Sequence, residues 1–156
     1  MTALITGATS GIGRATAIRF ANESINLILC GRRQEELDTL KNELGKLVQV
    51  QTLNFDVRNN EDVQKAISNL PENFKQIDIL INNAGNAHGL DPIQTGSVED
   101  WDAMLDINVK GLLYVSKAVI PQMTARKSGH IINIGSTAAK EVYPNGNVYC
   151  ASKHAV

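Results

Sequence analysis

Short apolar runs alternate with longer amphipathic stretches along this chain, and the alternation limits its possible folds more than any single residue does. Several of the short runs are apolar throughout, as strands buried on both faces must be. Patterns typical of strands cover residues 3–6, 26–30, 48–55, 77–82 and 130–136. Helical patterns between them cover residues 12–22, 34–44, 61–70 and 98–126. Repeated strand and helix predict an α/β fold, a doubly wound parallel sheet with helices on both faces.

Local signals place the helix ends. Ser97 and Asp100 form a Ser-x-x-Asp version of the capping box at the start of the long helix. Gly45 and Pro71 are expected to end two of the shorter helices. Pro121 falls inside the long helix and predicts a kink or its last turns.

Length and composition predict one domain over residues 1–156, because 43% hydrophobic content supports one core and the chain is too short for two large ones. A net charge of -1 gives no broad positive field, so we expect neither nucleic acid nor a membrane as partner. The two cysteines, Cys30 and Cys150, form no disulfide framework, and no signal peptide precedes the first strand. A cytoplasmic location is therefore expected.

A glycine-rich turn follows the first predicted strand and opens the first helix: Thr6-Gly7-Ala8-Thr9-Ser10-Gly11-Ile12-Gly13. Glycines there permit a tight turn and let the backbone approach a pyrophosphate, which rests on the free N–H groups of the helix N-terminus. The turn predicts a Rossmann-type dinucleotide site, although its spacing differs from the usual Gly-x-Gly-x-x-Gly.

The end of the second predicted strand indicates which dinucleotide fits. An NAD site places a carboxylate there, whereas the 2'-phosphate of NADP requires cations. Here the strand ends in Cys30-Gly31-Arg32-Arg33, with no carboxylate before Glu35. The local charge therefore favours NADP, unless the arginines are only a solvated helix start.

Further polar residues follow the third and fourth predicted strands, where strand ends face the ligand crevice of such sheets. Asp56 is placed to accept from an adenine amino group, and the amides of Asn82 and Asn83 either hold loops or contact ribose. The expected cofactor residues at these strand ends are Asp56, Val57, Asn82, Asn83, Ala84 and Gly85.

The last segment carries a proton-transfer pattern. Tyr149 and Lys153 lie four residues apart on one helical face, and Ser136 at a strand end can reach both. A tyrosine side chain ionises near pH 10 and needs help to act as a base at neutral pH, which a nearby ammonium supplies. A serine hydroxyl can hold the substrate oxygen.

With these motifs the chain resembles the short-chain dehydrogenase/reductase family, and within it the NADP-dependent 3-hydroxy acid dehydrogenases that oxidise serine and allo-threonine. The resemblance implies that Tyr149 is the acid or base, that it and Lys153 also contact cofactor, and that Asn108 holds a water linking Lys153 to solvent. Substrate contacts are expected from Ser136, Tyr143 and Asn147. The resemblance also implies a homo-oligomer.

The resemblance implies a longer chain, since family members continue past the Tyr-x-x-x-Lys helix. The sheet is thus expected to stop after the fifth strand and the start of the next helix. A 3-oxoacyl-thioester reductase uses the same side chains and remains the alternative enzyme. An inactive truncated chain or a nucleotide-sensing module remains the alternative without activity. No histidine has a partner at metal-ligand spacing, so no metal is expected.

Overall fold

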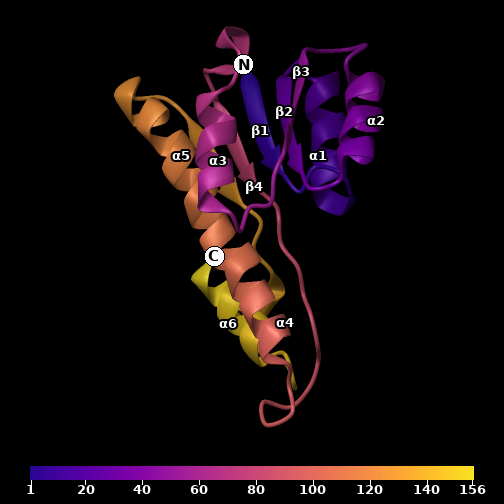
Figure 1. The fold of residues 1–156 in the computed structure, drawn as a ribbon, viewed down its shortest axis with the longest axis vertical. Coiled ribbons are helices and arrows are strands. Elements are labelled where there is room, and N and C mark those ends of the chain that lie inside the picture. The colour runs from indigo at the N-terminus through magenta and orange to yellow at the C-terminus, as the bar shows by residue number, and fades with distance from the viewer.

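The computed structural model describes residues 1–156 as a five-stranded parallel sheet with helices on both of its faces (Figure 1). The strands lie in the order β3-β2-β1-β4-β5. Their bounds are β1 (Thr2–Thr6), β2 (Asn26–Gly31), β3 (Val50–Asn54), β4 (Ile79–Asn82) and β5 (His130–Asn133). The order reverses between β1 and β4, and in such sheets ligands bind beyond the strand carboxyl ends at this point. The predicted fold class is confirmed.

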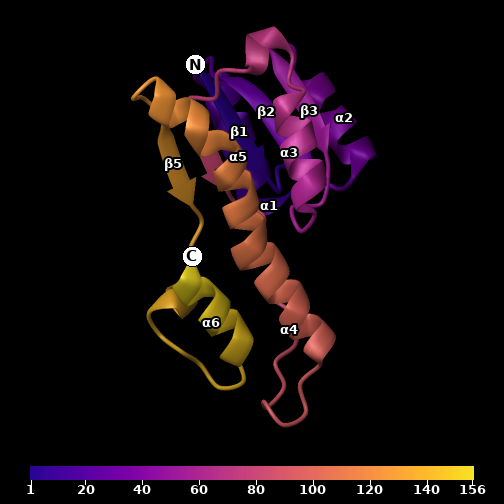
Figure 2. The ribbon, with the colours of Figure 1, turned by 60° about the vertical axis from the view of Figure 1, so that its left-hand side comes forward.

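The helices fall close to their predicted places. They are α1 (Gly11–Asn22), α2 (Gln34–Leu44), α3 (Asn60–Ser68), α4 (Val98–Leu105), α5 (Leu112–Ala125) and α6 (Asn147–Ala155). There are also two short 3-10 helices, η1 (Glu72–Phe74) and η3 (Thr137–Ala139). A π-helical segment, η2 (Asp106–Gly111), joins α4 to α5. The predicted long helix is thus one rod with a π-helical centre (Figure 2), and it continues past Pro121 to end at Ala125.

The sheet separates two hydrophobic cores, and alternation along the strands assigns side chains to each. Along β1, Leu4 faces one core whereas Ala3 and Ile5 face the other. Leu4 packs with side chains from α3 and α5, namely Val63, Ile67, Val115, Val119 and Met123. The opposite core packs side chains from α1 and α2, namely Ala17, Ala21, Leu37, Leu40 and Leu44. Both faces of β1 are therefore covered, and this explains the apolar run from Ala3 to Ile5 at its centre.

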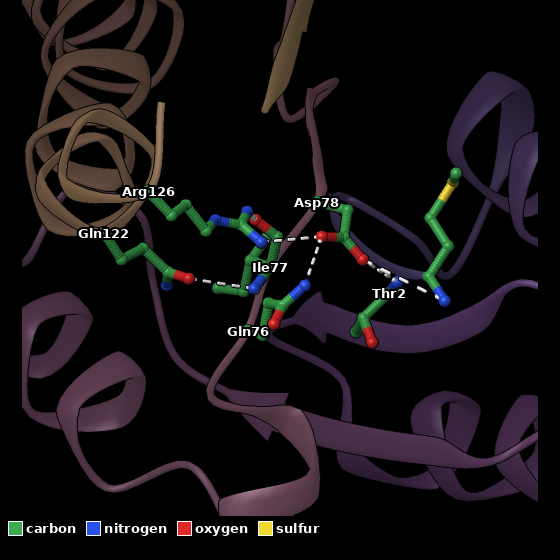
Figure 3. A network of polar contacts seen from close by, with 7 residues as sticks. Thr2, Gln76, Ile77, Asp78, Gln122 and Arg126 are labelled. Atoms are coloured by element: carbon green, nitrogen blue, oxygen red, sulfur yellow. Dashed lines mark hydrogen bonds and ion pairs between the residues drawn. The ribbon is translucent and has the colours of Figure 1, made fainter. Parts of the chain in front are cut away.

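A polar network ties the start of the sheet to the end of α5 (Figure 3). Asp78 accepts hydrogen bonds from the Thr2 amide at 2.8 Å and from Arg126 at 2.7 Å. Gln76 donates to the same carboxylate at 2.9 Å, and Gln122 accepts from the amide of the residue before Asp78 at 2.9 Å. The network lies at the amino ends of β1 and β4, opposite the strand ends where ligands bind.

None of the helices combines the length and the apolar character that crossing a membrane requires.

Candidate active site

A cavity of about 590 Å³ opens at the carboxyl ends of the strands and is lined by 22 residues. Its walls come from the turn between β1 and α1, from the ends of β2, β3, β4 and β5, and from α6. The residues expected to bind cofactor that line it are Gly7, Thr9, Ser10, Gly11, Ile12, Arg32, Arg33, Asp56, Val57, Asn83, Ala84, Gly85, Tyr149 and Lys153. One cavity thus joins the glycine-rich turn to the tyrosine and lysine.

The glycine-rich turn is held by the segment that follows β4. The Asn83 side-chain amide donates to the carbonyl oxygens of Thr6 and Gly7 at 2.9 and 3.1 Å. The backbone N–H groups of Asn83 and Ala84 donate to the Thr6 hydroxyl at 3.0 and 2.9 Å. Gly7 has a φ of 62°, in the region that favours glycine. The turn and the neighbouring strand end are therefore one rigid unit.

Two residues expected to contact cofactor do not line the cavity. Gly13 packs beneath the turn, where a Cβ atom would collide with Gly7 O and the Asn83 side chain. Asn82 is 3% exposed, and its amide donates to Ser116 and Asn133, each at 3.0 Å. The physical reason is that Gly13 is packed against the underside of the turn and the Asn82 side chain points into the interior. Each therefore supports the residues that line the cavity without lining it.

The two arginines after β2 reach the cavity with part of their charge already paired. Arg33 donates to the Thr9 hydroxyl at 2.9 Å and forms an ion pair with Glu36 at 2.7 Å. Arg32 lies 3.6 Å from the Asp56 carboxylate, and both arginine side chains are more than half exposed. The contact with Thr9 brings Arg33 to the glycine-rich turn, so both cations are available to an anion bound there.

Asp56 lies at the cavity with its charge compensated by Arg58, a residue that the sequence analysis did not single out. Arg58 donates to the carboxylate through Nε at 3.0 Å and Nη2 at 2.7 Å. Partial burial alone would raise the pKa of Asp56, but the hydrogen bonds and charge of Arg58, with the charge of Arg32, hold it below its usual value. Asp56 is therefore an acceptor that stays ionised.

Helix α6 brings Tyr149 and Lys153 to the opposite end of the cavity. Lys153 is 8% exposed, and its ammonium donates to the carbonyl oxygen of Ile134 at 3.0 Å. Burial lowers the pKa of this lysine, because a charged group is less stable away from water. Tyr149 is partly exposed and lines the same cavity. A buried cation and a phenol thus share one wall.

The residues expected to contact substrate lie outside the cavity lining. Ser136 is half-buried, and its hydroxyl accepts a hydrogen bond from the Ala138 amide at 3.2 Å. Tyr143 is 40% exposed in the loop before α6. Asn147 starts α6 and donates to the Asp91 carbonyl oxygen at 3.4 Å. All three lie on the segment between β5 and Tyr149, but the structure does not bring them into the cavity.

Asn108 lies in the π-helical segment and is 1% exposed. Its Oδ1 accepts from the Asn86 amide at 2.8 Å, and its Nδ2 donates to Asn86 O at 2.9 Å and to Ser152 Oγ at 3.0 Å. The side-chain amide of Asn108 is thus committed to protein partners. Asn108 links the loop after β4 to α6.

Some cavity residues were not expected from the sequence: Cys30, Gly31, Phe55, Asn86, Ala87, Ile107, Ile134 and Gly135. Most directly flank an expected residue at a strand end, so the same strand-end argument would have included them. Ile107 had no sequence signal, because only the π-helical turn brings it to the cavity. The structure contains no cluster of three or more His, Cys, Asp or Glu side chains suited to a metal ion.

The fold and the cavity together define an α/β protein of the dinucleotide-binding type. The chain belongs to the short-chain dehydrogenase family, whose model matches residues 1–156. It is similar to the NADP-dependent 3-hydroxy acid dehydrogenase of Salmonella typhi, with 49% identity over 153 residues that cover 98% of this chain and 61% of the relative.

Two further proteins extend the comparison. Sulfoacetaldehyde reductase 2 of Chromohalobacter salexigens is 48% identical over 151 residues, covering 96% of this chain and 60% of the relative. A closed form of serine dehydrogenase complexed with NADP+ superposes with a TM-score of 0.93 and 48% identity, covering 99% of this chain and 61% of that one. The chain therefore spans about three fifths of the length of the proteins it matches.

Proposed function

We propose that this protein is an NADP-dependent oxidoreductase acting on small 3-hydroxy acids, such as serine or allo-threonine, or on the corresponding oxo compounds. The observation that carries the proposal is the single cavity, which joins a glycine-rich turn, two arginines, and the Tyr149 and Lys153 pair. A binding site alone would not require the last two residues. Their presence in the same cavity supports a reaction on a bound substrate.

The residues of the cavity fit NADP(H). A Cβ atom at Gly7 or Gly13 would collide with neighbouring protein atoms, so these glycines let the turn pack closely against Asn83. The N-terminus of α1 then offers a pyrophosphate unpaired N–H groups. Arg32 and Arg33 supply the positive charge that a 2'-phosphate requires. When bound, NADP(H) supplies or accepts the hydride, and the protein has to bind, orient and move a proton.

Tyr149 is the proposed proton donor and acceptor. Its phenol lines the cavity beside Lys153, whose buried ammonium stabilises negative charge on the phenol oxygen more strongly than it would in water. In the oxidation direction Tyr149 takes the proton of the substrate hydroxyl, and in the reduction direction it returns one.

Ser136 is the proposed holder of the substrate oxygen. Its hydroxyl oxygen accepts from the Ala138 amide, so its own proton remains free to donate. Gly135, just before it, lines the cavity, and a modest movement of the segment would bring the hydroxyl to the substrate. Donation to the substrate oxygen would orient it toward Tyr149 and stabilise developing negative charge.

The substrate class is tested with a panel under NADP+ and NADPH. Serine, allo-threonine and 3-hydroxypropionate belong to the proposed substrate class. Sulfoacetaldehyde is included because one similar protein is named for its reduction. A 3-oxoacyl thioester is the substrate of the alternative enzyme. Turnover highest with the 3-hydroxy acids supports the proposal. A preference for the thioester would replace it by the reductase, and NADPH binding without any turnover would favour a nucleotide-sensing module.

The cofactor is tested with a variant that carries Arg32→Gln and Arg33→Gln. The two arginines would pair with the 2'-phosphate that only NADP carries, so NADPH affinity should fall at least tenfold while NADH affinity stays within about twofold. Isothermal titration with both cofactors gives the two changes. Equal losses for NADPH and NADH would show that the arginines only support the fold.

A homo-oligomer remains part of the proposal. The long rod of α4, η2 and α5 exposes four large apolar side chains, Val98, Leu105, Leu113 and Ile120, between 40% and 57%. Exposed apolar side chains in such numbers on one rod are typical of contact surfaces. Light scattering on the purified protein should give a multiple of the monomer mass, and a monomer mass would contradict this.

A further inference from the structure

Helix α6 (Asn147–Ala155) carries the proposed catalytic pair and packs against α4, η2 and η3. Its hydrogen bonds to these and other elements are few. Three hydrogen bonds join its side chains to other elements. Asn147 donates to Asp91 O at 3.4 Å, Lys153 donates to Ile134 O at 3.0 Å, and Ser152 accepts from Asn108 at 3.0 Å. The last is the only one between two side chains.

The bond between Ser152 and Asn108 is also the most deeply buried of the three. Ser152 is 0% exposed and Asn108 is 1% exposed, so water does not compete for either group. In such surroundings, removing one partner leaves the other buried without its hydrogen bond, which destabilises that arrangement. A buried pair of this kind specifies one position of α6 against the long rod.

The Ser152 hydroxyl is saturated in this position. It accepts from Asn108 Nδ2 at 3.0 Å and donates its single proton to the carbonyl oxygen of Tyr149 at 2.8 Å. It therefore has no proton to offer a substrate. What it does is connect Asn108 to the backbone of Tyr149.

Asn108 in turn fixes the loop after β4. Both of its amide atoms bond the backbone of Asn86, a residue that lines the cavity beside Gly85. An added Cβ atom at Gly85 would lie 3.2 Å from Asn108 Oδ1 and 3.5 Å from Lys153 Nζ, which shows how closely these groups pack. The π-helical turn presents Asn108 between the loop and α6, and π-helical turns are frequent at functional sites.

We propose that Ser152 is a positioning residue for the proton-transfer pair, and this inference rests on the proposed function. Through Asn108, it sets the distance between Tyr149 on α6 and the loop after β4, which lies on the cofactor side of the cavity. A displacement of about 1 Å in such a site lowers turnover by about a hundredfold. Ser152 thus governs turnover without touching substrate or cofactor.

The chain provides a matched control for this inference. Ser116 on α5 is 9% exposed and accepts from the Asn82 amide at 3.0 Å, the same kind of buried bond at the same distance. It makes no hydrogen bond to α6. Both alanine variants lose a buried bond from an asparagine amide, and Ser152→Ala also loses the bond that its hydroxyl donates to the Tyr149 carbonyl oxygen. Only Ser152→Ala loses a link to the helix that carries the proposed catalytic pair.

The experiment measures kcat, KM, NADPH affinity and thermal stability of both variants in the protein that carries this sequence. Ser152→Ala should lower kcat by about 10- to 100-fold while NADPH affinity stays within about twofold. Ser116→Ala should also lose stability, by no more than Ser152→Ala, while its kcat stays within about twofold. Ser152→Thr, which keeps the hydroxyl, should recover most of the lost kcat. Equal loss of kcat in the two alanine variants, or an unchanged kcat in Ser152→Ala, would overturn the inference.

Two further measurements keep the test decisive. If Ser152→Ala does not fold, Ser152→Cys keeps a weak donor and acceptor at this position and should give an intermediate kcat. If the unaltered protein shows no turnover, the proposed function fails, and amide hydrogen exchange then tests the link itself. Faster exchange in α6 for Ser152→Ala but not for Ser116→Ala supports the link. Unchanged exchange in α6 overturns it.

Discussion

Strands β1 and β5 belong to the same parallel sheet but lie in opposite surroundings. All five residues of β1 are buried, whereas all four residues of β5 are exposed. β1 lies between β2 and β4, and β5 pairs with β4 alone at the margin of the sheet (Figure 2). The glycine-rich turn follows β1, and Ser136 and α6 follow β5. Within this chain, the glycine-rich turn thus follows a buried strand, and the segment that carries Ser136 and α6 follows an exposed one.

The hydrogen bonds show the consequence of this difference. Four bonds from Asn83 and Ala84 hold the glycine-rich turn to the next strand end. By contrast, Lys153 has one bond, to Ile134. The glycine-rich side of the cavity is therefore bonded directly into the sheet, whereas few hydrogen bonds hold the side that carries Tyr149 and Lys153. A part with few buried contacts opens more easily than a packed core.

The first prediction compares a glycine from each side of the cavity. At Gly13 a Cβ atom would meet Gly7 O and Asn83 Nδ2, whereas at Gly135 it would meet nothing within 4 Å. Gly13→Ala should therefore destabilise the protein by about 3 kcal/mol, and Gly135→Ala by less than about 0.5 kcal/mol. Urea unfolding measures both. A similar loss of unfolding free energy in the two variants would contradict the difference in packing between the two sides of the cavity.

The second prediction concerns the network that joins the two parts of the chain at the far end of the sheet (Figure 3). Asp78 accepts from the Thr2 amide of β1 and from Arg126 after α5, so Asp78→Asn should lose about 2 kcal/mol at pH 7. Asp102→Asn, at an exposed carboxylate of α4, serves as the control and should change the free energy of unfolding by less than about 0.5 kcal/mol.

The effect of Asp78 should depend on pH. Partial burial alone would raise its pKa, but hydrogen bonds from Gln76, Arg126 and Thr2, with the charge of Arg126, lower it. Because the folded pKa lies below the unfolded value of about 3.9, the stabilisation is fully present above about pH 4. It is lost as the pH falls through the folded pKa. A difference between the protein and Asp78→Asn that grows toward acid pH would contradict this.

The third prediction tests whether Lys153, which the proposed reaction requires, lowers the free energy of unfolding. Burial lowers the pKa of Lys153, so holding its charge in the fold is unfavourable at neutral pH. Lys153→Met should raise the free energy of unfolding by about 1 kcal/mol, and Tm by about 2–4 °C, while turnover is lost. Lys117→Met, at an exposed position of α5, should leave Tm nearly unchanged. A lower Tm for Lys153→Met would show that this lysine supports the fold.

The sequence predicted the fold well where apolar pattern and burial coincide. The second strand, expected over residues 26–30, is observed as β2 (Asn26–Gly31) because both its faces are covered. The third was expected to start at Val48 but begins at Val50, since Val48 packs against the core without pairing in the sheet. The π-helical segment had no sequence signal, because it depends on the contacts of Asn108 with Asn86 and Ser152.

The candidate site divides in the same way. Residues at strand ends, such as Asp56 and Gly85, could be placed from the sequence because parallel strands bring their carboxyl ends together. The sequence does not show which side chains pair with one another, so the hydrogen bonds from Arg58 to Asp56 were not predicted. Nor could the sequence tell that Asn82 points into the interior. Contacts between distant segments decide these points.

The central claim is that the two sides of the cavity form one NADP-dependent site in which Tyr149 transfers the proton. The most direct test measures kcat and NADPH affinity for Tyr149→Phe, with Tyr114→Phe on α5 as the matched control. Tyr149→Phe should lower kcat at least a hundredfold while NADPH affinity stays within about twofold, and Tyr114→Phe should keep both. Unaltered turnover in Tyr149→Phe would contradict the claim.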